Sequence, residues 1–182
     1  MIQSLKLRLV ALTSVLALTV GCDQVSKHVA RTLLDPAESI PLLGGFAELI
    51  LRENPGSFLS LGASLPEPIR RFFLTFAVGV SLVVLLIYIA RNGARLGLLF
   101  FAALALIWAG GTSNLIDRIV REGHVTDFLI LRLGPLQTGV FNAADVIIVV
   151  GALALAVSIY RAPSEKSKDD LLRPSQSNKA DS

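Results

Sequence analysis

Histidine, cysteine and clustered charge are scarce in this chain. Its 182 residues include only two histidines, His28 and His124, and one cysteine, Cys22. One cysteine excludes an internal disulfide, and these three residues supply neither an HExxH motif nor a Cys/His cluster for zinc. We therefore expect no metal and no other cofactor. The basic residues are scattered and the formal net charge is only +3, which argues against a nucleic-acid partner.

Apolar residues are abundant instead. They make up 53% of the chain, and the mean hydropathy is +0.65, too high for a soluble domain of this size. Apolar runs at about 4–22, 72–90, 96–116 and 141–160 are long enough to cross a bilayer. The prediction is an all-α membrane protein, a four-transmembrane-helix bundle forming one domain over 1–161. Loops 23–71 and 117–140 would be extracytoplasmic, and the charged segment 162–182 a disordered cytoplasmic tail.

The first apolar run and the orientation leave alternatives open. Residues Ile2 to Gly21 could be a membrane helix or a cleaved signal peptide, and TVGC resembles a lipobox that would make Cys22 a processed N-terminus. Four spans place both termini on one side. Lysine and arginine divide almost evenly between the two sides, so the charge rule favours cytoplasmic termini only by a small margin.

The first long loop contains a strand signal. Gly44 and Gly45 mark a turn, and the following sequence FAELILREN alternates apolar and polar residues up to Asn54. We expect a short strand there.

Unusual polar residues converge on one face of the predicted membrane bundle. In an antiparallel bundle the end of span one, the first loop, the end of span three and the start of span four share that face. The residues are Asp23, Lys27, Asn54, Asn114, Asp117, Arg118, Asn142 and Asp145. Acids and amides at membrane depth call for a functional explanation. A structural explanation is that the span-three group merely ends a helix at the interface.

Two acids near this face could act together. Asp127 could also be a solvated loop residue, and Asp145 could simply cap the helix that begins near it. Two carboxyl groups brought together in a low-dielectric site tend to share one proton. One can then act as general base on water while the other polarises a peptide carbonyl, the chemistry of aspartic proteases. Nucleophilic catalysis fits less well, because Cys22 has no nearby histidine in the sequence.

Five motifs in order carry a resemblance to a known family. They are DQVSK from Asp23, NPGSF from Asn54, NLIDR from Asn114, GHVTDF from Gly123 and FNAAD from Phe141. Together with the four spans, this ordered set resembles the lipoprotein signal peptidases, also called signal peptidase II, from Asp23 to about Tyr160.

The resemblance implies an aspartyl endopeptidase of the bacterial inner membrane, multi-pass and with its site near the periplasmic face. It would cut prolipoproteins just before a cysteine that carries diacylglycerol, with membrane lipid close by. The catalytic pair would be Asp127 and Asp145. Substrate-binding residues would be Asn54, Gly56, Asn114, Arg118 and Asn142, and structural support would come from Asp23, Lys27 and Asp117, with Asp117 paired to Arg118. The family also implies a small extracytoplasmic β-sheet from the first loop, inhibition by globomycin-type compounds, and a protein that works as a monomer.

The chain departs from the family pattern in three places. NPGSF is one residue shorter than usual and contains Pro55 and Ser57, Ser113 replaces a glycine, and the segment from Arg118 to Asp127 is one residue longer. Both acids of the pair are present, so the departures bear on substrate preference and inhibitor affinity. A specialised paralogue would fit them.

Two other functions are compatible with acids near the membrane. A proton-linked transporter would spread charges through the depth of the bundle, whereas the middles of spans two and four have none. A membrane protein that binds lipoproteins without cutting them would be favoured by loss of one acid of the pair.

Overall fold

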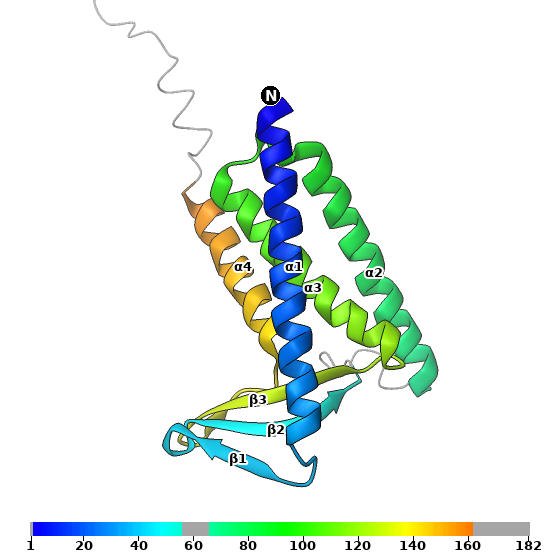
Figure 1. Cartoon of the computed structure of the whole chain (residues 1–182), viewed down its shortest axis with the longest axis vertical. Helices are drawn as coiled ribbons and strands as arrows, with labels where there is room; N and C mark the ends of the chain where they lie inside the picture. Colours follow the sequence, from blue (N-terminus) through cyan, green and yellow to red (C-terminus); the bar gives the residue numbers. More distant parts are fainter. Residues whose placement is uncertain (1, 56–65, 162–182) are drawn as a thin grey trace, which may run out of the picture.

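A computed structural model describes residues 2–55 and 66–161 and contains, in that part of the chain, four long helices and one small antiparallel sheet (Figure 1). The helices are α1 (Ile2–Leu33), α2 (Glu67–Asn92), α3 (Leu98–Val120) and α4 (Ala143–Tyr160). The strands are β1 (Ser39–Leu42), β2 (Ala47–Asn54), β3 (Val125–Leu133) and β4 (Leu136–Gln137), with short 3₁₀ turns η1 (Leu43–Gly45) and η2 (Gly93–Arg95). Gly56 and the tail 162–182 lie outside the described residues.

Helix α3 is the centre of the bundle and contacts each of the other three helices. Its buried residues include several small ones, among them Ala103, Ala109 and Gly110, which let neighbouring backbones come close. A β-carbon added to Gly110 would lie 2.8 Å from the carbonyl oxygen of Ala144 on α4. The contact between α3 and α4 is therefore a backbone-to-backbone contact that tolerates no side chain at this position.

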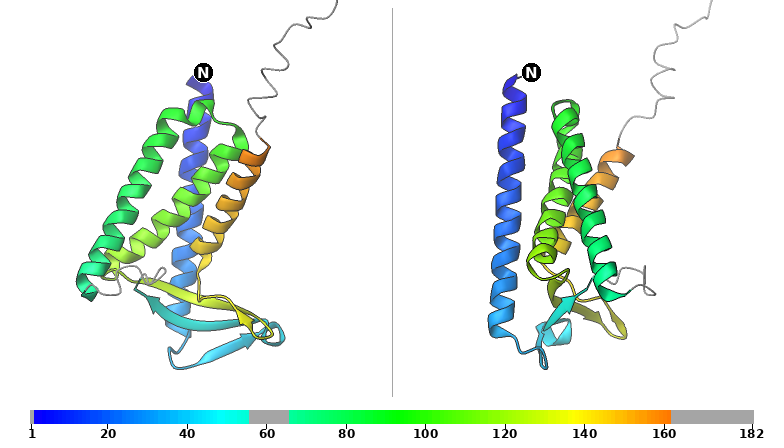
Figure 2. Two further views of the ribbon diagram at one scale, coloured as in Figure 1. Left: turned by 180° about the vertical axis from the view of Figure 1, so that it is seen from behind. Right: turned by 90° about the vertical axis from the view of Figure 1, so that its right-hand side faces the viewer.

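All four helices are long and apolar enough to span a membrane, so the chain is a multi-pass membrane protein. The beginning of α1 and the end of α4 lie at the same end of the bundle, and the sheet lies at the other end (Figures 1 and 2). This arrangement agrees with the predicted antiparallel four-span bundle.

Helix α1 continues well past residue 22, where the sequence analysis ended the first span. Asp23 and Lys27 therefore lie inside a helix and not in a loop. They are four residues apart and form an ion pair of 2.7 Å, so the charges neutralise each other on one helix face. The other helix ends also differ by a few residues: α2 begins at Glu67, α3 ends at Val120 and α4 begins at Ala143.

The sheet receives strands from both long loops, whereas the sequence analysis derived it from the first loop alone. The predicted strand leading to Asn54 is β2, and Gly44 and Gly45, with φ of +67° and +91°, form the turn before it. Strand β2 pairs with β3 in the order β1-β2-β3-β4, with Asn54 opposite Val125. This register brings the end of β2 beside Asp127.

Candidate active site

The polar residues meet where the helix bundle joins the sheet. They come from the second half of α1, the last turns of α3, the first turn of α4, the end of β2 and the start of β3 (Figure 1). All the predicted site residues that the structure describes lie in this region. Gly56 is outside the described residues and is not included.

Asp127 lies on β3 and is only 2% exposed, so the interpretation as a solvated loop acid is wrong. Its two carboxylate oxygens accept hydrogen bonds from the amides of Asn54, at 2.9 Å, and Asn142, at 2.7 Å. Burial raises the pKa of Asp127 to about 6, and the nearby Asp145 adds to the rise, while the two amide hydrogen bonds and the Lys27 charge oppose it. Burial therefore prevails, and this carboxyl holds a proton in mildly acidic conditions.

Asp145 lies in the first turn of α4 and is partly exposed. It caps the helix as the sequence allowed: its carboxylate accepts the backbone N–H of Asn142 at 3.1 Å, while the Asn142 side chain accepts the backbone N–H of Asp145 at 3.0 Å. Its second oxygen accepts the side-chain amide of Asn114 at 2.9 Å. Capping is thus one role of this residue, and the contact to α3 goes beyond it.

Two asparagines connect the two acids. The amide nitrogen of Asn142 donates to Asp127 and also to the side-chain oxygen of Asn114, at 3.1 Å. The amide nitrogen of Asn114 in turn donates to Asp145. The hydrogen bonds therefore form one chain from Asp127 through Asn142 and Asn114 to Asp145.

A charged cluster of Asp23, Lys27 and Asp117 lies next to Asn114. Lys27 is fully buried and forms ion pairs with Asp23 at 2.7 Å and Asp117 at 2.8 Å. The predicted pairing of Asp117 with Arg118 is corrected here, because Asp117 binds Lys27 and lies 4.0 Å from Arg121. The reason is helical geometry: Asp117 and Arg118 are adjacent on α3 and point to different sides.

Arg118 lies close enough to both Asp127 and Asp145 to interact with their charges. One of its terminal nitrogens contacts the backbone oxygen of Asn114 at a long 3.5 Å. Its buried Nε has no hydrogen-bond partner among the described residues. A buried donor without an acceptor is unfavourable, so this group is available to bind an incoming acceptor.

Three residues that the sequence analysis did not select complete the network. Gln24 donates to Asp117 at 3.0 Å, Ser113 donates to Asp23 at 2.7 Å, and the backbone N–H of Thr126 donates to Asp117 at 3.3 Å. Gln24 and Thr126 are uncharged members of the DQVSK and GHVTDF motifs, and Ser113 was noted only as a departure. Attention to charge alone missed them.

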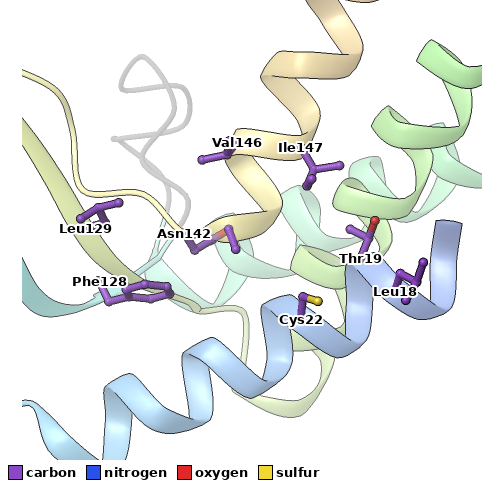
Figure 3. Close-up of a pocket in the computed structure, with 9 residues that line it drawn as sticks. Leu18, Thr19, Cys22, Phe128, Leu129, Asn142, Val146 and Ile147 are labelled. Carbon is purple, nitrogen blue, oxygen red and sulfur yellow. The ribbon is translucent and has the colours of Figure 1, made fainter.

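An apolar pocket of about 450 Å³ opens beside the Asn142 side chain (Figure 3). Its walls come from α1, β3 and α4, and Asn142, the donor to Asp127, forms part of the lining. The other lining residues are Leu18, Thr19, Cys22, Phe128, Leu129, Ala143, Val146 and Ile147. The pocket can accept a hydrocarbon group next to the acids.

The arrangement supports acid–base chemistry on a substrate that approaches from the membrane. One acid is buried with a raised pKa, the other is partly exposed, and an arginine donor and an apolar pocket lie beside them. Within residues 2–55 and 66–161, no three histidine, cysteine, aspartate or glutamate side chains are grouped so that they could hold a metal.

Comparisons with known proteins agree on one family. Residues 15–161 match the family described as Signal peptidase (SPase) II. The lipoprotein signal peptidase of Moorella thermoacetica is 36% identical over 152 residues, covering 84% of this chain and 94% of that protein. The lipoprotein signal peptidase of Desulforapulum autotrophicum is also 36% identical, over 162 residues, covering 88% of this chain and 96% of that protein. A solved bacterial membrane enzyme shares the fold, with a TM-score of 0.70 at 21% identity over 84% of this chain and 94% of that one.

Proposed function

The chain belongs to the signal peptidase II family and removes signal peptides from lipoproteins, and we propose that Asp127 and Asp145 are the catalytic pair that does so. The observation that supports this most strongly is the linkage of these two carboxyl groups by the amides of Asn114 and Asn142. The linkage holds two acids from different segments in one place, as shared-proton catalysis requires.

The different environments of the two acids support different roles for them. Asp127 is buried and has a pKa of about 6, so it carries the proton and donates a hydrogen bond to the substrate carbonyl. Asp145 is partly exposed, so water can reach its carboxyl group, and we assign it the role of general base on that water.

The reaction follows from these roles. Asp145 takes a proton from water while the water oxygen attacks the scissile carbonyl carbon, and Asp127 passes its proton to the carbonyl oxygen. As the tetrahedral intermediate collapses, the C–N bond breaks, the departing cysteine amine takes the proton from Asp145, and the oxygen returns its proton to Asp127. The products are a signal peptide with a new carboxylate and a lipoprotein with a new amino terminus.

We predict that kcat/KM for cleavage falls as the pH rises through about 6. Deprotonation of Asp127 removes the acid that polarises the carbonyl, so activity is retained below its pKa of about 6 and lost above it. The measurement is a pH profile of cleavage by purified enzyme in detergent micelles, with a synthetic diacylglyceryl peptide. A profile that instead rises through pH 6 would mean that Asp127 acts as the base.

Substrate binding is assigned to groups around the pair. Arg118 has an Nε donor without a partner among the described residues, which can bind a peptide carbonyl. Asn54, Asn114 and Asn142 hold the acids and border the peptide. Gly56, two residues after Asn54 in the sequence, is also proposed to bind substrate. The apolar pocket beside Asn142 accommodates an acyl chain of the diacylglyceryl cysteine. Its hydrocarbon lining at membrane depth fits lipid better than a polar peptide segment.

Replacement of Cys22 by Trp tests this use of the pocket. The indole would fill space that the acyl chain needs, so we expect KM for a diacylglyceryl peptide to rise about tenfold while kcat changes little. Val83→Trp, on a largely exposed site of α2, adds the same side chain away from the pocket and should behave like the wild type. An unchanged KM in Cys22→Trp would place the acyl chain elsewhere.

Further parts of the proposal concern the cellular setting. The protein lies in the bacterial inner membrane with both termini in the cytoplasm and the sheet and site toward the periplasm, where exported lipoproteins emerge. The site is assembled from elements of a single chain, which supports a monomer. Globomycin-type cyclic peptides compete with the substrate for the region of Asn54 and Arg118.

A further inference from the structure

Lys27 is a buried charge that the proposed reaction does not use. Its ammonium group has three hydrogen-bond donors and no acceptor. They meet three acceptors: Asp23 at 2.7 Å, Asp117 at 2.8 Å and the side-chain oxygen of Asn114 at 2.9 Å. The first two contacts neutralise charge, but the third is to an uncharged amide that also binds Asp145 and is linked to Asp127 through Asn142.

The contact decides which way the Asn114 amide faces. The oxygen and nitrogen of an asparagine side chain have nearly the same shape, so the surroundings determine the orientation. Lys27 and the amide nitrogen of Asn142 both donate to the oxygen of Asn114. The nitrogen must then point the other way, and it donates to Asp145.

The opposite orientation would disturb both acids. A rotated Asn114 would direct its NH₂ group against the donors of Lys27 and Asn142 and its oxygen against the carboxylate of Asp145. The Asp145 carboxyl group could then face the oxygen of Asn114 only if it carried a proton. The Asn142 amide, which holds Asp127, would lose its hydrogen bond to Asn114. The proton would then be on the wrong acid for the reaction.

We propose that Lys27 is a positioning residue for the catalytic pair, which fixes the Asn114 amide so that Asp145 is held as the ionised base and Asp127 as the acid. The inference rests on the proposed function of the pair. It assigns Lys27 a role in the reaction, beyond support of the fold.

The charge of Lys27 also reaches Asp127. The groups that act on the Asp127 carboxyl are Asp145 on α4, which raises its pKa, and Lys27 on α1, which lowers it, while Arg118 on α3 lies close to both acids. Loss of the Lys27 charge therefore raises the pKa of Asp127. In a variant without this charge, the pH above which activity is lost should be higher than with Lys27 present. Weakened packing alone would not produce this effect.

The experiment compares K27M/D117N with D117N. Removal of Lys27 alone would leave two buried acids, of which Asp117 would retain only Arg121 at 4.0 Å, whereas the double variant keeps the net charge that Asp23, Lys27 and Asp117 have together. Relative to D117N, we expect the double variant to lose about 10- to 100-fold in kcat. The pH at which kcat/KM falls on the alkaline side of the profile, its basic limb, should be higher in the double variant by about half to one pH unit. K27R, which retains a donor and the charge, should keep the limb of the wild type.

The outcomes separate this inference from the proposed function. If K27M/D117N has the kcat and the limb of D117N, Lys27 is structural only. If the double variant does not accumulate in the membrane, N114D decides: it keeps an acceptor for Lys27 but cannot donate to Asp145, so it should accumulate and lose about 100-fold in kcat. Full activity of N114D would overturn the amide's role. Wild-type enzyme without a basic limb near pH 6 would instead contradict the proposed acid–base assignment.

Discussion

Asp145→Asn and Asp127→Asn are each expected to lower the rate of lipoprotein cleavage by about 10²- to 10⁴-fold, the usual contribution of a general acid or base. An asparagine at 145 cannot take a proton from water, and one at 127 cannot give a proton to the carbonyl oxygen. Both substitutions keep the side-chain shape, and the Asp127 replacement removes a buried carboxyl whose pKa is raised to about 6, so the fold should survive.

The assay follows precursor and mature lipoprotein on gels after reconstitution with a diacylglyceryl precursor. Asp35→Asn is the matched control, because Asp35 is an exposed carboxyl in the turn after α1 that accepts a backbone N–H from Ala37. It should cleave like the wild type. Cleavage at the wild-type rate by either pair variant would show that the acid concerned is not catalytic. The same assay separates a peptidase from a transporter and from a protein that only binds lipoproteins.

Gly110→Val is expected to destabilise the protein by about 1–3 kcal/mol or more. A β-carbon at this site lies 2.8 Å from the backbone oxygen of Ala144 and 2.8 Å from Ile148, and a backbone oxygen cannot move aside as a flexible side chain can. Helices α3 and α4 would have to separate. The hydrogen bond of 2.9 Å between Asn114 and Asp145 spans the same interface, so we expect activity to fall about 100-fold as well.

The matched control for this prediction is Gly21→Val on α1. A β-carbon there meets no atom within 4 Å, so the same change in a spanning helix should alter stability by only a few tenths of a kcal/mol. Thermal unfolding in detergent and the cleavage assay measure the two variants together. Equal unfolding temperatures for both variants would mean that the α3–α4 contact can adjust to a side chain.

Much of the fold followed from apolar periodicity and length. The four helices, their antiparallel order and the strand that leads to Asn54 were predicted from the sequence and are present. The predicted site residues that the structure describes lie together: those near the ends of the apolar runs share one face of the bundle, and β2 and β3 bring Asn54 and Asp127 to it. Their catalytic roles remain predictions.

The errors have physical causes. The first span was expected to end at residue 22, where the apolar run stops, whereas the i,i+4 ion pair of Asp23 and Lys27 makes both residues compatible with a helix that continues to Leu33. Asp117 was paired with its sequence neighbour Arg118, although its partner Lys27 is 90 residues earlier in the chain. Strand β3 was not foreseen because pairing across two loops leaves little signal in either loop alone.

The pairing of β2 with β3 has a consequence for biogenesis. Strand β2 is synthesised before α2 and α3, and β3 and the α4 residue Asp145 follow them. The β1–β2 hairpin therefore has an open edge while the ribosome makes the next two helices, and the edge is covered only when β3 emerges. A nascent chain released after β3 but before its last helix would have the paired sheet and Asp127 but would lack Asp145, so we expect proteolytic activity only once α4 has been made.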